Sequence, residues 1–240
     1  MNLPEKIYKY RAFDNLEYVK EIFEKNQLYL AKRTDLNDPF EGCNFRIHLG
    51  VAGESIPQGA GEQHSSIKEK LEKYRILSLS ETCRSPQMWA HYADNYSGFC
   101  LQFSTKENFK DLKPVKYISS DTINERKTIL EDGEELQKIM IESYHKKGDE
   151  WGYEKEYRIL RPKKQKYFKF ENKELEAIIL GVKISEKNKK LLEKYAKENE
   201  IKILKMFISN ESYKIRILDN DRDVKRDGSN IEDIDLKEFN

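Results

Sequence analysis

The sequence predicts an α+β fold, in which mostly antiparallel strands form a mixed or split sheet and helices are inserted between them. Three observations lead to this prediction. Apolar residues alternate along several short runs, as they do in strands with one buried face. Helical stripes with capping signals separate these runs. The chain contains no internal repeat and no linker-like change in composition, so we expect one domain over residues 1–218.

The first quarter of the chain predicts a strand, a helix, a second strand and a turn. Residues 7–11 alternate as a strand does, and residues 27–31 do so again. Between them, Asp14 and Glu17 have the spacing of a capping box, which predicts a helix start. Asn37-Asp38-Pro39 predicts a turn, because the residue before a proline is kept out of the helical region. A glycine-rich loop without phosphate-binding spacing is expected over residues 50–66.

The stretch from Arg75 to Phe103 is the least charged and most aromatic part of the chain. It predicts a strand over residues 75–81, a helix that begins at Ser85-Pro86, and a strand over residues 99–103. Its serine, tryptophan, histidine and tyrosine side chains indicate either a functional site or a core with a polar edge.

The second half of the chain predicts further strands and one more helix. Strands are expected over residues 153–160, 175–180, 201–208 and 213–218. Ser185 is the expected start of the helix between the second and third of these strands. Residues 219–240 are charged and weakly patterned, which indicates a weakly ordered tail.

Composition limits the classes of partner. The 44 basic and 43 acidic residues give a net charge of +1, which provides no long-range attraction to nucleic acid or membrane. The basic run over residues 161–166 favours a surface loop over a phosphate-binding patch. Three cysteines without a paired spacing, no apolar run of membrane-spanning length and no signal peptide together predict a soluble cytoplasmic protein.

Glu154 and Glu156 are the sharpest candidates for chemistry. Alternate residues of a strand share one face, roughly 6–7 Å apart along the chain. Like charges at this distance raise the pKa of one carboxyl when water is excluded, and paired carboxylates serve in glycosyl transfer. The alternative is a solvated strand face in a chain rich in glutamate.

Other candidates carry weaker signals. His91 fits either a general base or a packed, hydrogen-bonded histidine. Arg11, at the end of the first strand, fits either a diphosphate clamp or an ordinary surface arginine. The remaining histidines lack metal-ligand spacing and two cysteines lack a neighbouring base, so we expect no metal and no cysteine nucleophile: His48, His64, His145, Cys83 and Cys100.

Four motifs, taken in order, resemble a large bacterial family known as domain of unknown function number 2971. The resemblance spans about residues 7–182, and the family name implies no activity. The motifs occupy residues 8–11, 36–41, 88–93 together with 98–103, and 153–160.

A more distant resemblance does imply an activity. A basic residue on a first strand, Ser-x-Ser on a middle strand and Glu-x-Glu on a later strand form an order that is similar to the arginine-serine-glutamate class of ADP-ribosyltransferases. Ser-Leu-Ser stands here where that class has Ser-Thr-Ser. The resemblance implies an ADP-ribosyltransferase-like fold and NAD as substrate. It implies NAD binding by Arg11, Ser78 and Ser80, stabilisation of the ribosyl cation by Glu156, and orientation of the acceptor by Glu154. With their neighbours, the candidate sets are Glu156, Glu154 and His91 for catalysis and Tyr10, Arg11, Ser78, Ser80, Trp89 and Tyr92 for NAD binding.

These resemblances favour an ADP-ribosyltransferase-like enzyme of a bacterial phage-defence or toxin system. It would transfer ADP-ribose from NAD to a protein or nucleic-acid acceptor, or hydrolyse NAD. The alternative is a non-enzymatic partner-binding or sensing module of a defence pair, with the surface from Trp89 to Tyr92 as its interface. A nuclease is disfavoured, because the sequence shows neither a carboxylate cluster for a metal nor a basic excess.

Overall fold

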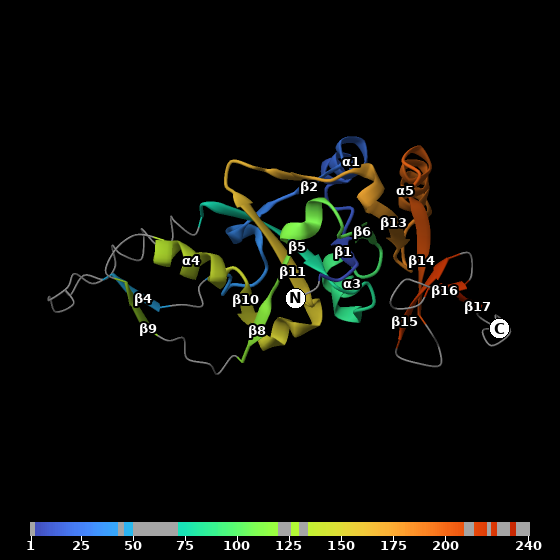
Figure 1. Cartoon of the computed structure of the whole chain (residues 1–240). Coiled ribbons are helices and arrows are strands. Elements are labelled where there is room, and N and C mark those ends of the chain that lie inside the picture. The colour runs from blue at the N-terminus through green and yellow to red at the C-terminus, as the bar shows by residue number, and fades with distance from the viewer. Residues whose placement is uncertain are drawn as a thin grey trace. The chain divides into compact units, whose positions relative to one another are not determined.

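The computed structural model describes residues 3–42, 46–49, 72–119, 126–129, 134–208, 214–219, 222–224 and 231–233. Helices accompany a mixed, mostly antiparallel sheet, so the predicted α+β class is confirmed (Figure 1). By backbone contacts the chain divides into two compact units. Two compact units can belong to one folding domain, so the single-domain organisation stays a prediction. Unit 1 comprises Met1–Leu28, Leu79–Asp111 and Lys169–Asn240, and unit 2 comprises Tyr29–Ser78 and Leu112–Phe168.

Unit 1 is built on a sheet in the order β17-β16-β15-β14-β13-β6-β1. β13 and β14 are parallel, and the other neighbours are antiparallel. All six residues of β6 are buried, and β1 and β13 pair with its two edges. β16 and β17 lie in the segment for which the sequence predicts a weakly ordered tail. The strands are β1 (Lys6–Arg11), β6 (Phe99–Ser104), β13 (Leu175–Leu180), β14 (Lys202–Ile208), β15 (Ile215–Asp219), β16 (Arg222–Val224) and β17 (Ile231–Asp233).

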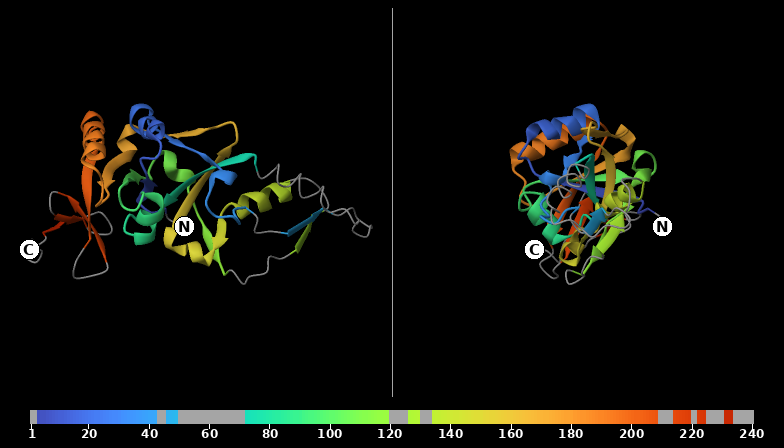
Figure 2. Two further views of the ribbon diagram at one scale, coloured as in Figure 1. Left: turned by 180° about the vertical axis from the view of Figure 1, so that it is seen from behind. Right: turned by 90° about the vertical axis from the view of Figure 1, so that its left-hand side faces the viewer.

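Two helices of unit 1 pack against each other. α1 (Leu16–Lys25) and α5 (Glu186–Glu198) lie side by side (Figure 2). The rings of Phe23 on α1 and Tyr195 on α5 stack with their centroids 4.8 Å apart. Asn15 caps α1 by accepting from two backbone N–H groups, so the predicted cap at Asp14 is wrong by one residue. Ser185 caps α5 as predicted. The short 3-10 helices of this unit are η2 (Asn108–Asp111) and η4 (Asn172–Glu174).

The predicted helix after Ser85 is confirmed as α3 (Pro86–Tyr92). The Ser85 hydroxyl accepts from the N–H of Met88, and Pro86 occupies the first turn, where its missing N–H costs nothing. Trp89 is fully buried, and its indole N–H donates to the carbonyl of Cys83 over 2.7 Å. The helix is therefore fastened to the core of unit 1 through Trp89.

Gly181 follows β13 at a point where two backbone segments approach closely. A Cβ at this position would lie 2.2 Å from the Tyr96 carbonyl oxygen and 2.6 Å from that of Gly98. Gly181→Ala is therefore expected to lower the free energy of unfolding by about 1–3 kcal/mol or more, measured by urea denaturation. Gly152→Ala is the control, because a Cβ there would meet no heavy atom within 4 Å. Equal stability of the two variants would contradict this steric argument.

Unit 2 contains the sheet order β3-β5-β11-β7 and two parallel pairs, β8 with β10 and β4 with β9. The predicted strand over residues 75–81 is confirmed as β5, whose last two residues belong to unit 1. The predicted loop over residues 50–66 lies outside the described residues. The strands are β3 (Ala31–Lys32), β4 (Arg46–Leu49), β5 (Tyr74–Ser80), β7 (Lys113–Pro114), β8 (Lys116–Ile118), β9 (Arg126–Ile129), β10 (Lys146–Gly148) and β11 (Glu156–Pro162). β2 (Gln27–Tyr29) and β12 (Tyr167–Lys169) each contain a boundary between the units.

α4 (Glu134–Ser143) packs on the strands of unit 2. Ile139, Met140 and Tyr144, at its end, form an apolar cluster with Ile76 of β5. The predicted turn at Asn37-Asp38-Pro39 is confirmed, because the Asp38 carboxylate accepts from the N–H of Phe40 and the Asp38 carbonyl accepts from the N–H of Glu41. The remaining elements are η1 (Arg33–Asp35) and η3 (Asp149–Glu154).

Among the described residues, no helix is both long and apolar enough to cross a membrane.

Candidate functional site

The predicted site residues are divided between the two units. Ser78, Glu154 and Glu156 belong to unit 2. The resemblance to the ADP-ribosyltransferases implies that Arg11 and Glu156 serve one NAD site, and this stays a prediction because the two residues belong to different units. The residues in unit 1 are Tyr10, Arg11, Ser80, Trp89, His91 and Tyr92.

Glu154 and Glu156 do not alternate along one strand, so that prediction is wrong. Glu154 ends η3, Lys155 has the left-handed conformation with φ 44° and ψ 52°, and β11 begins only at Glu156. Neither carboxylate is solvated, because the two residues are 3% and 5% exposed. The two glutamates therefore form neither a pair on one strand face nor a solvated strand face, the two arrangements that the sequence suggested.

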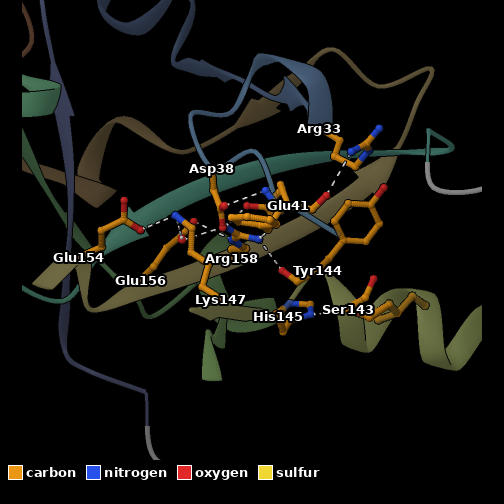
Figure 3. Close-up of polar contacts among 12 residues, drawn as sticks. Arg33, Asp38, Glu41, Ser143, Tyr144, His145, Lys147, Glu154, Glu156 and Arg158 are labelled. Atoms are coloured by element: carbon orange, nitrogen blue, oxygen red, sulfur yellow. Dashed lines mark hydrogen bonds and ion pairs between the residues drawn. The ribbon is translucent and has the colours of Figure 1, made fainter. Parts of the chain in front are cut away.

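Arg158 is the centre of a buried charge cluster formed by Glu41, Lys147, Glu154, Glu156 and Arg158 (Figure 3). Its guanidinium donates to both oxygens of Glu156, over 2.6 Å and 2.9 Å. It also binds both oxygens of Glu41, one of them over 2.8 Å, and donates to the Tyr144 carbonyl over 2.6 Å. Such paired contacts suit the planar fork of arginine, which holds two carboxylates at once.

Lys147 joins the remaining carboxylate to the charge cluster. Its ammonium donates to Glu154 over 2.6 Å and lies 3.4 Å from an oxygen of Glu156. It also lies 4.6 Å from the centre of the Trp151 ring, where a cation is attracted by the π-electrons. One ammonium thus bridges the two glutamates that the sequence had placed on a common strand face.

The charge cluster ties together segments that are far apart in the chain. Glu41 comes from the turn after η1, Lys147 from β10 and Glu154 from η3. Glu156 and Arg158 are alternate residues of β11 and lie on one face of that strand. The Tyr117 hydroxyl of β8 accepts from the N–H of Glu156 over 2.8 Å. The cluster therefore fixes the tertiary arrangement within unit 2.

Burial and charge act against each other at the carboxylates. Burial favours a raised pKa for Glu156, but the positive charges of Arg158 and Lys147 and the hydrogen bonds from Arg158 outweigh it and lower the pKa to about 2. At Glu41 burial dominates, so its pKa is raised although Arg158 pulls it down. Three carboxylates, those of Glu41, Glu154 and Glu156, face two cations, so the cluster carries one surplus negative charge. Among the described residues, no group of three or more His, Cys, Asp or Glu side chains fits a metal ion.

The predicted residues of unit 1 have separate roles. The Tyr10 hydroxyl donates to the Thr82 carbonyl over 2.8 Å, and the Ser80 hydroxyl accepts from the N–H of the same residue. Burial lowers the pKa of Arg11. His91 is exposed, whereas Trp89 is fully buried, so Trp89 cannot contribute to a surface between residues 89 and 92.

Sequence reasoning missed Glu41, Lys147 and Arg158. A signal for Arg158 was present, because it follows Glu156 at the spacing that shares a strand face. Glu41 was noticed only as the end of a turn, since its partner lies 117 positions away. Lys147 lies in a charged region where nothing in the sequence distinguishes a buried lysine from a solvated one.

Comparison with known proteins supports one of the two resemblances over part of the chain. No curated protein and no solved structure matches the chain. The resemblance to the ADP-ribosyltransferases therefore has no support from these comparisons. Four of the five residues of the charge cluster, all except Glu41, lie in the segment that does match a family. Residues 88–159 match the model of the family described as Protein of unknown function (DUF2971).

Proposed function

We propose that this chain is a non-enzymatic partner-binding module that presents Phe40 to its partner. The observation that carries the proposal is the contrast within one turn. Phe40 is 74% exposed, while Asp38 and Glu41 on either side of it are 4% and 1% exposed. An aromatic side chain held in water by a fixed backbone is suited to serve as an interface anchor.

The charge cluster supports this proposal by immobilising the turn. Glu41 is bound through both carboxylate oxygens to Arg158, and its carbonyl accepts from Arg33. The Asp38 carboxylate caps the backbone N–H of Phe40 itself. An anchor that is already held in one backbone conformation loses little conformational entropy on binding, so its burial contributes more fully to affinity.

The same contacts argue against a catalytic role for Glu156. A carboxylate that stabilises a ribosyl cation must face the developing positive charge. Both oxygens of Glu156 instead accept from Arg158, and one of them also lies within ion-pair distance of Lys147. The negative charge is thus already compensated by the protein's own cations.

The NAD-dependent ADP-ribosyltransferase-like enzyme is the second candidate, because one contact favours it. The Ser78 hydroxyl helps to lower the pKa of the Glu156 carboxyl. The resemblance assigns NAD binding to Ser78 and stabilisation of the ribosyl cation to Glu156. On this proposal the enzyme uses NAD in a phage-defence or toxin system and acts on a protein or nucleic-acid acceptor.

Release of nicotinamide from NAD distinguishes the two proposals. For a binding module we expect the wild-type chain to release no more nicotinamide than Glu156→Gln, with circular dichroism confirming that both are folded. For the enzyme, Glu156→Gln would lower turnover by about a hundredfold or more with little change in NAD affinity, because the carboxylate acts in the transition state. Turnover by the wild type that is lost in folded Glu156→Gln would overturn our first proposal.

A cross-linking experiment tests directly whether Phe40 binds a partner. Wild type, Phe40→Ser and Ile208→Ser are each cross-linked in a lysate of the source organism, and the proteins that each chain captures are compared. Ile208 is the control, because it is also an exposed apolar residue, at 45%. We expect Phe40→Ser to keep wild-type stability and to lose the partner, since loss of an anchor weakens binding by about thirtyfold or more. Ile208→Ser should keep the partner. The same captured set for all three chains would contradict a role for Phe40.

We further propose that the chain acts in the cytoplasm. Cys83 and Cys100 are free, buried thiols, which suits a reducing compartment.

A further inference from the structure

The loop between β11 and β12 gathers positive charge on one exposed segment of unit 2. Residues 157–170 include no acidic side chain. Lys163, Lys164 and Lys166 are exposed, and Lys73 joins them because its carbonyl accepts from the N–H of Lys163 over 2.7 Å. The basic loop is defined here as these four lysines together with Arg161. Because the whole chain has a net charge of only +1, this segment is a marked local excess of positive charge.

The backbone of the basic loop is held at several points. Arg75, which is only 6% exposed, donates to the carbonyls of Lys163 and Leu30 over 2.8 Å and 3.0 Å. The N–H of Leu30 donates to the Lys166 carbonyl over 2.9 Å, and the N–H of Gln165 closes a turn on the Pro162 carbonyl. A buried arginine thus orders the main chain, while the lysine side chains extend into solvent.

The four lysines are not neutralised by ion pairs with the described carboxylates. Among the described residues, Lys73, Lys163, Lys164 and Lys166 form no ion pair with a carboxylate, although charged residues make up 36% of the sequence. The phosphates of a polyanion would supply the missing partners, and release of their counterions would favour binding.

Aromatic rings lie beside the basic loop. Tyr167 and Tyr29 are both partly exposed and meet edge to face, with ring centroids 6.1 Å apart. The guanidinium of Arg75 lies 5.7 Å from the centre of the Tyr29 ring and so steadies that ring. Unpaired bases stack on such side chains, whereas the bases of a duplex are already stacked on one another.

We propose that the basic loop binds single-stranded nucleic acid, with the four lysines on the phosphates and Tyr167 against a base. This binding is independent of the partner proposed for Phe40. It is also compatible with the balanced net charge, because phosphate contacts depend on a local cluster and not on the charge of the whole chain. Arg161, whose guanidinium lies 5.8 Å from the Phe168 ring centre, borders the same surface.

The test is fluorescence anisotropy of a labelled oligothymidylate with the full chain at about 50 and about 200 mM salt. Four phosphate contacts predict a slope of log K against log salt of about −3, which is a loss of about fiftyfold over this range. Lys163→Ala/Lys164→Ala should reduce the steepness of the slope by about 1.4, so the loss of affinity should be about sevenfold greater at the lower salt concentration than at the higher one. Tyr167→Leu should weaken binding without changing the slope, because stacking releases no counterions.

Lys187→Ala/Lys190→Ala is the matched control, because it removes two exposed lysines of α5 and changes the net charge equally. Wild-type affinity in this control supports the proposal. Equal losses of affinity in the two double variants would overturn the proposal, since binding would then depend only on the net charge of the chain. Absence of binding by the wild type at low salt would also overturn it, as would equal affinity for a duplex of the same length. Tighter loop-dependent binding to vesicles that contain phosphatidylserine would overturn it in favour of a membrane surface.

Discussion

Arg158→Ala is expected to lower the free energy of unfolding by about 3–5 kcal/mol, the range measured when one partner of a buried ion pair is removed. Arg158 is 1% exposed and donates to four carboxylate oxygens and one carbonyl. Without it, the buried carboxylates of Glu41 and Glu156 would lose the cation that binds both of them. Burial of a carboxylate without a partner costs far more than the loss of a single contact.

Urea denaturation followed by circular dichroism measures this effect. Lys173→Ala is the control, because Lys173 pairs with Glu171 over 2.9 Å while its side chain is 67% exposed. The control should unfold close to wild type, since water screens an exposed pair. Should Arg158→Ala fail to fold, Arg158→Lys remains informative, because it keeps the charge but loses the paired contacts, and it should be intermediate. An Arg158→Ala variant as stable as the control would refute the structural importance of the cluster.

Glu156→Gln is expected to destabilise the chain more than Glu41→Gln, although both remove a buried carboxylate bound to the same guanidinium. The pKa of Glu156 is lowered to about 2, so the fold favours its charged form. The pKa of Glu41 is raised, so the fold favours its neutral form. Replacing Glu41 by an amide also removes the surplus negative charge of the cluster. The loss for Glu156→Gln should be on the order of a few kcal/mol, and that for Glu41→Gln should be clearly smaller.

The two carboxyls also have opposite effects on the pH dependence of stability. Glu156, whose pKa is lowered in the folded chain, stabilises the fold above pH 4.5, the pKa of the unfolded chain. This contribution is lost as the pH falls from 4.5 toward about 2. Glu41, whose pKa is raised in the folded chain, stabilises the fold below pH 4.5, and this contribution is lost as the pH rises through the folded pKa of Glu41. The stability difference between wild type and Glu156→Gln should therefore shrink as the pH falls below 4.5.

Urea midpoints across this pH range test both statements. Relative to wild type, Glu41→Gln should gain stability as the pH rises above 4.5, because it has no carboxyl left to ionise. Glu156→Gln should show its largest deficit near neutral pH. If Glu41→Gln lowered the free energy of unfolding more than Glu156→Gln at neutral pH, the expected order of the two carboxyls would be wrong.

Local signals in the sequence sufficed for much of the fold. Alternation predicted β5, β6 and β13, and the Ser85-Pro86 pair predicted the start of α3. These features depend on side-chain periodicity and on capping by neighbouring residues. Both signals involve residues only a few positions apart in the chain. The start of β11 was missed, because the left-handed conformation of Lys155 leaves no pattern in residue type.

Only the tertiary structure decided what the two glutamates do. The sequence by itself determined that the chain is α+β, that its charges nearly balance, and that Glu154 and Glu156 lie close together in the chain. A carboxylate acts as a base, a solvated group or half of an ion pair according to its burial and its neighbours. Those neighbours are Lys147, Arg158 and, through Arg158, Glu41. Glu41 and Arg158 are 117 positions apart, and only folding brings such distant charges to hydrogen-bonding distance in a site that excludes water.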